Sequence, residues 1–183
     1  MASAHDFSFT GIDGKKIHLK DYAGKPVLVV NVASFCGFTP QYSELQKLHD
    51  KYGPKGLVVL GVPSNDFGAQ EPKSESEIKK FCETSFGVSF PMTAKQTVVG
   101  LDAHELYKWF SGEASEAVAP KWNFHKYLIG KDGKLAGSWP SKVSPMSPEI
   151  TGQIEMMLAG SLPSKVSPTS PEIIGQLEMM LAG

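Results

Sequence analysis

The chain has 183 residues, of which 41% are hydrophobic and 20% charged, a composition that suits one domain with a buried core and argues against a disordered protein. Its 18 basic residues, all lysines, and its 19 acidic residues give a net charge of −1 without a basic cluster, so we expect no nucleic-acid partner. The N-terminus lacks the apolar core of a secretory signal, and no later apolar stretch could cross a bilayer. We therefore expect a cytoplasmic protein without an integral membrane segment.

The first third of the chain predicts a hairpin followed by a β-α-β unit. Apolar and polar residues alternate over 6–25 around Asp13-Gly14, which indicates an N-terminal β-hairpin. Residues 26–34, "PVLVVNVAS", and residues 56–65, "GLVVLGVPSN", are typical of strands that are buried on both faces. The helix between them is predicted to begin with Thr39 as N-cap and Pro40 at its first position. Such a unit implies parallel strands joined by a right-handed crossover.

The rest of the chain adds helices and a second hairpin. Helices are predicted over 74–86 and 101–110, and a hairpin over 126–139 with its turn at Asp132-Gly133. A final helix over 147–160 is expected to be capped by Ser147 and Pro148. This order of elements predicts an α/β protein with a thioredoxin-like fold, in which helices flank a central mixed sheet.

The C-terminal tail is a tandem duplication. Residues 138–160 are followed directly by a second copy, 161–183, which is identical at 19 of 23 positions. Two copies are too few for a solenoid, whose core needs at least three repeats. We therefore predict a domain over 1–160 and an extra C-terminal helix in 161–183.

Cys36 stands where the first buried strand ends and a helix is about to begin. Backbone N–H groups at a helix N-terminus, together with the helix dipole, stabilise a thiolate, and the thiolate is the nucleophilic form of cysteine. The alternative is a small apolar residue that ends the strand. A thioredoxin-type CxxC pair would have a second cysteine where Thr39 stands, so the segment favours a single-thiol nucleophile.

Three segments carry a resemblance to a known family. "NVASFCGFTPQYSEL", "SNDFGAQEP" and "KWNFHKYLIGKDG" are similar to the signature segments of the glutathione peroxidase family in its non-selenium, cysteine-containing form, and they occur in the family's order. The resemblance runs from about residue 7 to residue 160. It implies Cys36 as the peroxidatic residue, with Gln70, Trp122 and Asn123 completing a catalytic tetrad. The family's second segment often has Cys and Gln where Ser64 and Asp66 stand here.

The three proposed partners of Cys36 also make chemical sense. A thiolate that attacks a peroxide expels hydroxide or alkoxide, so the site needs hydrogen-bond donors that do not themselves ionise. The amides of Gln70 and Asn123 and the indole of Trp122 are such donors. Without the resemblance, Trp122 would be interpreted as a core aromatic residue and Asn123 as a turn residue.

Cys82 has two interpretations. Its spacing from Ile78 and Phe81 places it on the apolar face of the predicted helix, which indicates packing. The resemblance implies a resolving cysteine in this helix, although the plant-type pattern has it one position later, where Glu83 stands. One position corresponds to about 100° of rotation on a helix. A disulfide between Cys36 and Cys82 would require a Cα separation within about 7 Å.

The resulting hypothesis is a thiol peroxidase without cofactor or metal. It would reduce hydrogen peroxide and organic or lipid hydroperoxides through a sulfenic acid at Cys36, and thioredoxin or else glutathione would reset it. The absence of arginine favours thioredoxin, because no guanidinium can bind the carboxylates of glutathione. A short segment over 111–120 resembles that of the monomeric members. The alternative is a peroxide sensor that passes a disulfide to a partner protein; a redox-inert binding module is a third interpretation.

Overall fold

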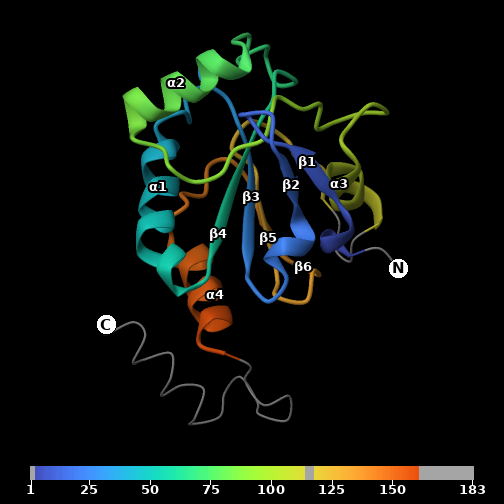
Figure 1. The fold of residues 1–183 in the computed structure, drawn as a ribbon, viewed down its shortest axis with the longest axis vertical. Helices are drawn as coiled ribbons and strands as arrows, with labels where there is room; N and C mark the ends of the chain where they lie inside the picture. The colour runs from blue at the N-terminus through green and yellow to red at the C-terminus, as the bar shows by residue number, and fades with distance from the viewer. Residues whose placement is uncertain (1–2, 114–117, 161–183) are drawn as a thin grey trace.

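A central sheet with helices on both faces organises the chain. The computed structural model describes residues 3–113 and 118–160. Figure 1 shows their strands and α-helices, which are β1 (Ser8–Thr10), β2 (Lys16–His18), β3 (Val27–Val32), α1 (Gln41–Tyr52), β4 (Val58–Pro63), α2 (Glu75–Phe86), α3 (Glu105–Lys108), β5 (Lys126–Ile129), β6 (Leu135–Trp139) and α4 (Pro148–Leu158).

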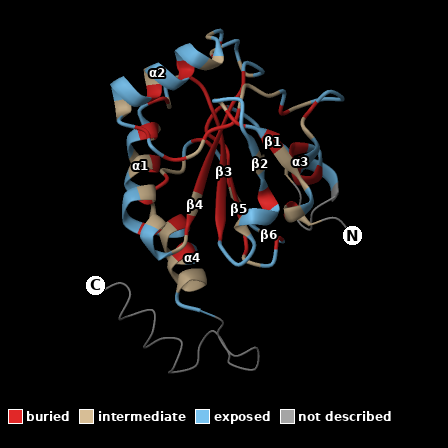
Figure 2. Cartoon of the chain, in the orientation of Figure 1, coloured by how far each residue is buried: buried red, intermediate tan, exposed pale blue. Residues whose placement is uncertain are grey.

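The sheet has the strand order β4-β3-β5-β6 and mixed direction. Strand β3 runs parallel to β4, as the β-α-β prediction requires, and antiparallel to β5. The β5–β6 hairpin turns where predicted, with Gly133 at φ 83°. Every residue of β3 is buried, because helices and loops cover both faces of the central strand (Figure 2).

Two hydrophobic cores lie on opposite faces of the sheet. Successive side chains of β3 alternate between them, as the pleat of a strand demands. Leu28 and Val30 join the first core, which the buried faces of α1, α2 and α4 complete. Val27 and Val29 join the second, which contains α3 and the residues around the β1–β2 hairpin. The hairpin turns at the predicted Asp13-Gly14, with Gly14 at φ 87°.

Three details of the predicted helices are wrong. Helix α1 begins at Gln41, with Pro40 rather than Thr39 at the N-cap and no side-chain cap. The helix predicted over 101–110 is limited to α3 and a π-helical turn, Trp109–Glu113. Ser147 and Pro148 stand at the N-cap and the first position of α4 as predicted, but the Ser147 hydroxyl makes no capping hydrogen bond.

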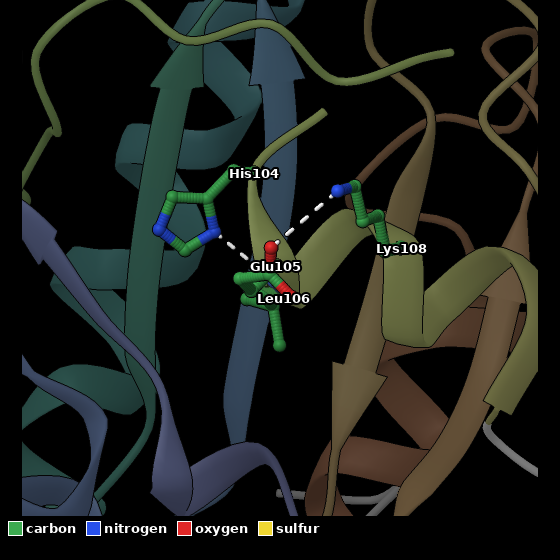
Figure 3. Close-up of polar contacts among 4 residues, drawn as sticks. All are labelled: His104, Glu105, Leu106 and Lys108. Carbon is green, nitrogen blue, oxygen red and sulfur yellow. Dashed lines mark hydrogen bonds and ion pairs between the residues drawn. The ribbon is translucent and has the colours of Figure 1, made fainter. Parts of the chain in front are cut away.

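The late start of α3 has a local cause. His104 caps the helix by accepting the N–H of Leu106 at Nδ1, 3.0 Å away, as Figure 3 shows. Its Nε2 lies 2.8 Å from the carbonyl oxygen of Ser8, which ties the cap to β1. Lys108 and Glu105 form an exposed ion pair at 3.4 Å across the same turn.

The predicted tail helix in 161–183 lies outside the described residues. Among the helices of residues 3–113 and 118–160, none combines the length and the apolar character that crossing a bilayer requires.

Candidate active site

Cys36 lies in a half-buried loop between β3 and α1. The backbone N–H of Phe38 donates a hydrogen bond to the Cys36 sulfur, with 3.4 Å between nitrogen and sulfur. This is the interaction predicted for a thiol just before a helix, although the donor belongs to the loop rather than to α1. A sulfur that accepts a backbone N–H and remains partly exposed is suited to react as a thiolate.

Thr39 fixes the conformation of this loop. Its Oγ1 accepts the backbone N–H of Cys36 at 2.9 Å and donates to the carbonyl oxygen of Ala33 at 2.9 Å. Its own N–H donates to the carbonyl oxygen of Cys36 at 3.0 Å. The residue that replaces the second cysteine of a CxxC pair therefore holds Cys36 in place.

Gln70 and Asn123 are in direct contact. The Asn123 amide nitrogen donates to Gln70 Oε1 at 2.8 Å and to the carbonyl oxygen of Phe67 at 3.3 Å. Both amide hydrogens of Asn123 are thereby engaged, and the Gln70 carbonyl oxygen is turned toward Asn123. The Gln70 backbone is joined to the residue before Cys36, because the N–H of Phe35 donates to the Gln70 carbonyl at 3.0 Å. The Gln70 NH₂ group makes no hydrogen bond to any residue that the structure describes, so it is a free donor.

Trp122 lies at the surface of the same site, with 37% of its side chain exposed. Its ring centroid is 5.7 Å from that of Phe67. A Cβ added to Gly68 would lie 3.1 Å from the indole, and Gly68 has a φ of 68°. A glycine is therefore required beside the indole for both space and backbone conformation.

The backbone around these residues is strained at two positions. Ala69 and Phe124 have φ values of 50° and 65°, in the left-handed region that costs residues other than glycine about 1–2 kcal/mol. Ala69 directly precedes Gln70, and Phe124 directly follows Asn123. Strain of this kind is typical of functional sites, where the surrounding structure enforces it.

Ser64 and Asp66, the departures from the family pattern, support this region. The Ser64 hydroxyl accepts the N–H of Asp66 at 3.2 Å. Asp66 Oδ2 accepts the N–H groups of Val98 at 2.6 Å and Val99 at 3.3 Å. Their side chains thus connect the loop before Gln70 to a neighbouring segment.

Cys82 lies in a different environment. It is 1% exposed on the inner face of α2, as its packing interpretation predicted. Burial raises the pKa of its thiol to about 11; a contact with the Tyr42 hydroxyl lowers it and the charge of Glu71 raises it further. The Tyr42 hydroxyl is buried without a well-formed hydrogen bond, so this contact with sulfur is loose. Both cysteines are free, and no disulfide joins them.

A cavity of about 270 Å³ adjoins Cys82, between α2, the β1–β2 hairpin and residues 88–92. Cys36 does not line it. The inner face of α2 is therefore incompletely packed around the buried thiol.

Sequence reasoning missed three polar residues of the site. Asn31 is buried in β3, and the Ser34 hydroxyl donates to the buried Glu71 carboxylate at 2.8 Å. Burial raises the pKa of Glu71. The available signal was the position of Asn31 and Ser34 inside an apolar run. In the described part of the chain, His, Cys, Asp and Glu form no group of three or more that could hold a metal ion.

Comparisons with known proteins identify a matching family model, relatives and solved structures. The family model described as "Glutathione peroxidase" matches residues 4–111. A "Hydroperoxy fatty acid reductase gpx1" from Synechocystis is 43% identical over 162 residues, which cover 84% of this chain and 95% of that protein. The crystal structure of T. cruzi GPX1 matches with a TM-score of 0.69 and 29% identity over 88% of this chain and all of its own. A thioredoxin family protein from Chlorobium tepidum matches with a TM-score of 0.58 and 20% identity, over 86% and 96% of the two chains, which confirms the thioredoxin-like fold.

Proposed function

The chain belongs to the glutathione peroxidase family, and we propose that it reduces hydrogen peroxide and organic or lipid hydroperoxides through Cys36. The observation that carries this proposal is the half-exposed Cys36 sulfur, which accepts the backbone N–H of Phe38. The residue before Cys36, Phe35, donates its N–H to the backbone carbonyl of Gln70, whose side chain is bonded to Asn123. Peroxidase chemistry is common to the family.

In the first step, the Cys36 thiolate attacks the terminal oxygen of the hydroperoxide. The S–O bond forms while the O–O bond breaks, and the leaving alkoxide or hydroxide takes a proton to become an alcohol or water. The Gln70 NH₂ group and the Trp122 indole N–H stabilise the leaving oxygen, and Asn123 completes the tetrad by orienting Gln70. Cys36 becomes a sulfenic acid.

In the second step, the Cys82 thiolate attacks the sulfenic sulfur. The S–S bond forms, the S–O bond breaks, and hydroxide leaves as water after protonation. Because Cys82 is 1% exposed on α2, we expect this step to involve partial unwinding of the helix. The cavity beside Cys82 favours such a movement, since fewer contacts must be broken.

An external dithiol then reduces the Cys36–Cys82 disulfide. Thioredoxin fits this role better than glutathione, because the chain has no arginine to bind the carboxylates of glutathione. Two exposed rings suit an apolar hydroperoxide such as that of a lipid: Phe35, the residue before Cys36, is 57% exposed, and Trp122, which packs near Phe67, is 37% exposed.

Rapid mixing of the reduced protein with hydrogen peroxide or a fatty acid hydroperoxide tests the first step, and turnover with thioredoxin or glutathione tests the last. We expect fast oxidation of Cys36 and faster turnover with thioredoxin. A protein that does not consume either peroxide would refute the proposed function, whereas faster turnover with glutathione would refute only the assigned reductant.

A peroxide sensor that passes a disulfide to a partner protein is the second candidate. The burial of Cys82 favours it, because slow internal resolution would prolong the life of the sulfenic acid. A sensor would form a stable mixed disulfide with one protein even when thioredoxin is present. A peroxidase would accumulate no such mixed disulfide and would turn over many times with thioredoxin.

For the tail, we propose that residues 1–160 form the catalytic domain and that the second copy, 161–183, is dispensable. The first copy already supplies Ile150 and Ile154 of α4 to the core. Deletion of 161–183 should leave a monomeric, active enzyme whose free energy of unfolding changes by less than about 1 kcal/mol. A truncated protein that fails to fold would show that the second copy completes the domain.

A further inference from the structure

Asn31 is a polar side chain inside the central strand of the sheet. It is fully buried in β3, between Val30 and Val32. A buried amide is unfavourable unless its polar atoms find partners. The Asn31 amide nitrogen has a partner that is distant in sequence: it donates to the carbonyl oxygen of Trp122 at 2.9 Å, whereas Oδ1 accepts no hydrogen bond from the described residues.

The backbone of Asn31 holds the same distant segment at a second point. The N–H of Phe124 donates to the Asn31 carbonyl oxygen at 2.6 Å. The regular pairing of β3 with β5 reaches only as far as Val30 and Lys126. Asn31 therefore extends the pairing of β3 with the β5 side by two hydrogen bonds. One goes to Trp122, the residue before Asn123, and the other comes from Phe124, the residue after it.

These two bonds enclose the turn that presents the site residues. Phe124 is held at φ 65°, a conformation that needs external support. Between the two bonded residues, the fully buried Asn123 donates to Gln70 Oε1. A chain of hydrogen bonds thus runs from β3 through the turn to the amide of Gln70.

We propose that Asn31 is a positioning residue for peroxide reduction. Its amide holds the 122–124 turn so that Asn123 keeps the Gln70 carbonyl turned inward and the Gln70 NH₂ group free. This proposal rests on the proposed function, because it assigns to Gln70 a role in stabilising the leaving oxygen. A small displacement of such a group is costly, since shifts of about 1 Å can slow a reaction on the order of a hundredfold.

The test replaces the amide and leaves the backbone bond in place. Asn31→Leu keeps a similar volume but leaves the Trp122 carbonyl without its donor. Asn31→Thr is a milder variant, because threonine favours strands and its hydroxyl is one bond too short to reach that carbonyl. Oxidation of Cys36 by hydrogen peroxide should slow by about 10- to 100-fold in either variant. Rapid quenching and mass spectrometry of the Cys36 peptide measure this rate.

A second readout reports on the turn itself. Trp122 is 37% exposed, whereas Trp109 and Trp139 are 5% and 8% exposed, so acrylamide quenching of tryptophan fluorescence reports mainly on Trp122. Quenching should change in the Asn31 variants. The matched control is Val30→Ala, a truncation at the preceding buried position of β3, which should lower stability but leave both the quenching and the oxidation rate within about twofold.

The outcomes separate the two proposals. A folded Asn31 variant with unchanged quenching and an unchanged oxidation rate would overturn the role of Asn31. If the wild type itself does not oxidise at Cys36, the proposed function fails, and the quenching comparison alone decides whether Asn31 holds the turn. If the Asn31 variants slow Cys36 oxidation no more than Val30→Ala does, Asn31 contributes only to core packing and not to positioning of the turn.

Discussion

The loop around Cys36 and the helix that carries Cys82 differ in how they are held. The Cys36 loop is cross-linked by Thr39 and joined to Gln70 through Phe35, and its sulfur is partly exposed. Helix α2 buries Cys82 at 1% exposure beside a cavity of about 270 Å³. The first region presents a partly exposed thiol in the conformation observed, whereas we expect the second to move before its thiol reacts with Cys36.

This difference suggests a division of labour between the two thiols. A pre-organised site accelerates the first oxidation because its donors need not reorient during the reaction. A buried thiol whose pKa is about 11 remains protonated at neutral pH and protected from oxidants. Variants that change one region and leave the other intact test this difference between the two thiols.

Replacement of the exposed thiol should have the largest effect. Cys36→Ser should reduce peroxide consumption to below a few per cent of the wild-type rate, since a serine hydroxyl is not ionised at neutral pH and is a poor nucleophile toward peroxide. A coupled thioredoxin assay measures this, with unfolding curves as the control for structure. Activity that persists would mean that Cys82, and not Cys36, is the thiol that reacts with peroxide.

Replacement of the buried thiol should separate the oxidation of Cys36 from the formation of the disulfide. Cys82→Ser should leave the first oxidation of Cys36 within about threefold of wild type but stop turnover with thioredoxin, because the sulfenic acid has no internal thiol with which to condense. Rapid mixing measures the first step and a coupled assay the second. Peptide mapping of the oxidised wild type should show a Cys36–Cys82 disulfide. If the variant turns over normally, Cys82 is a packing residue and glutathione becomes the better candidate for the reductant.

Loss of one donor should slow only the first step. Gln70→Ala should reduce the rate of Cys36 oxidation by about 10- to 1000-fold, as expected when one group that stabilises the leaving oxygen is removed. Gln46→Ala is the matched control, because Gln46 is a partly exposed glutamine of α1 that donates to Asp50 and Ser89. Equal rates for the two variants would show that the Gln70 amide does not contact the reacting oxygen.

The pH dependence of disulfide formation should report on Cys82. With a pKa of about 11, raised mainly by burial, the thiolate is the minor form from pH 7 to pH 9 and increases about tenfold per pH unit. The rate of disulfide formation should therefore rise up to about a hundredfold over this range without levelling. Single-turnover experiments at several pH values measure it. A plateau near pH 8.5 would mean that α2 is already open once Cys36 is oxidised.

The same contrast separates what the sequence could predict from what it could not. Local patterns predicted β3, β4 and both hairpins, because a strand buried on both faces has a continuous apolar run and each hairpin turn has an Asp-Gly pair. The cap of α3 was missed because His104 depends on contact with β1. The bond from Asn31 to Trp122 spans 91 positions, and nothing in either segment alone reveals it.

The smallest expected effect comes from loosening α2 without changing either cysteine. Ser74 caps this helix: it accepts the N–H of Glu77, whose carboxylate accepts the Ser74 N–H in return. Ser74→Ala should weaken the helix end by about 1 kcal/mol. If unwinding of α2 limits disulfide formation, that step should become up to about fivefold faster while Cys36 oxidation is unchanged.

A second N-cap serine provides the matched control. Ser147 stands at the start of α4, where its hydroxyl makes no capping hydrogen bond and no cysteine follows. Ser147→Ala should therefore leave both steps at the wild-type rate. Rapid mixing resolves the oxidation and disulfide steps in the two variants. A Ser74→Ala protein that forms the disulfide no faster than Ser147→Ala would mean that Cys82 reaches Cys36 without opening the N-terminal turn of α2, and the movement would then have to come from the Cys36 loop.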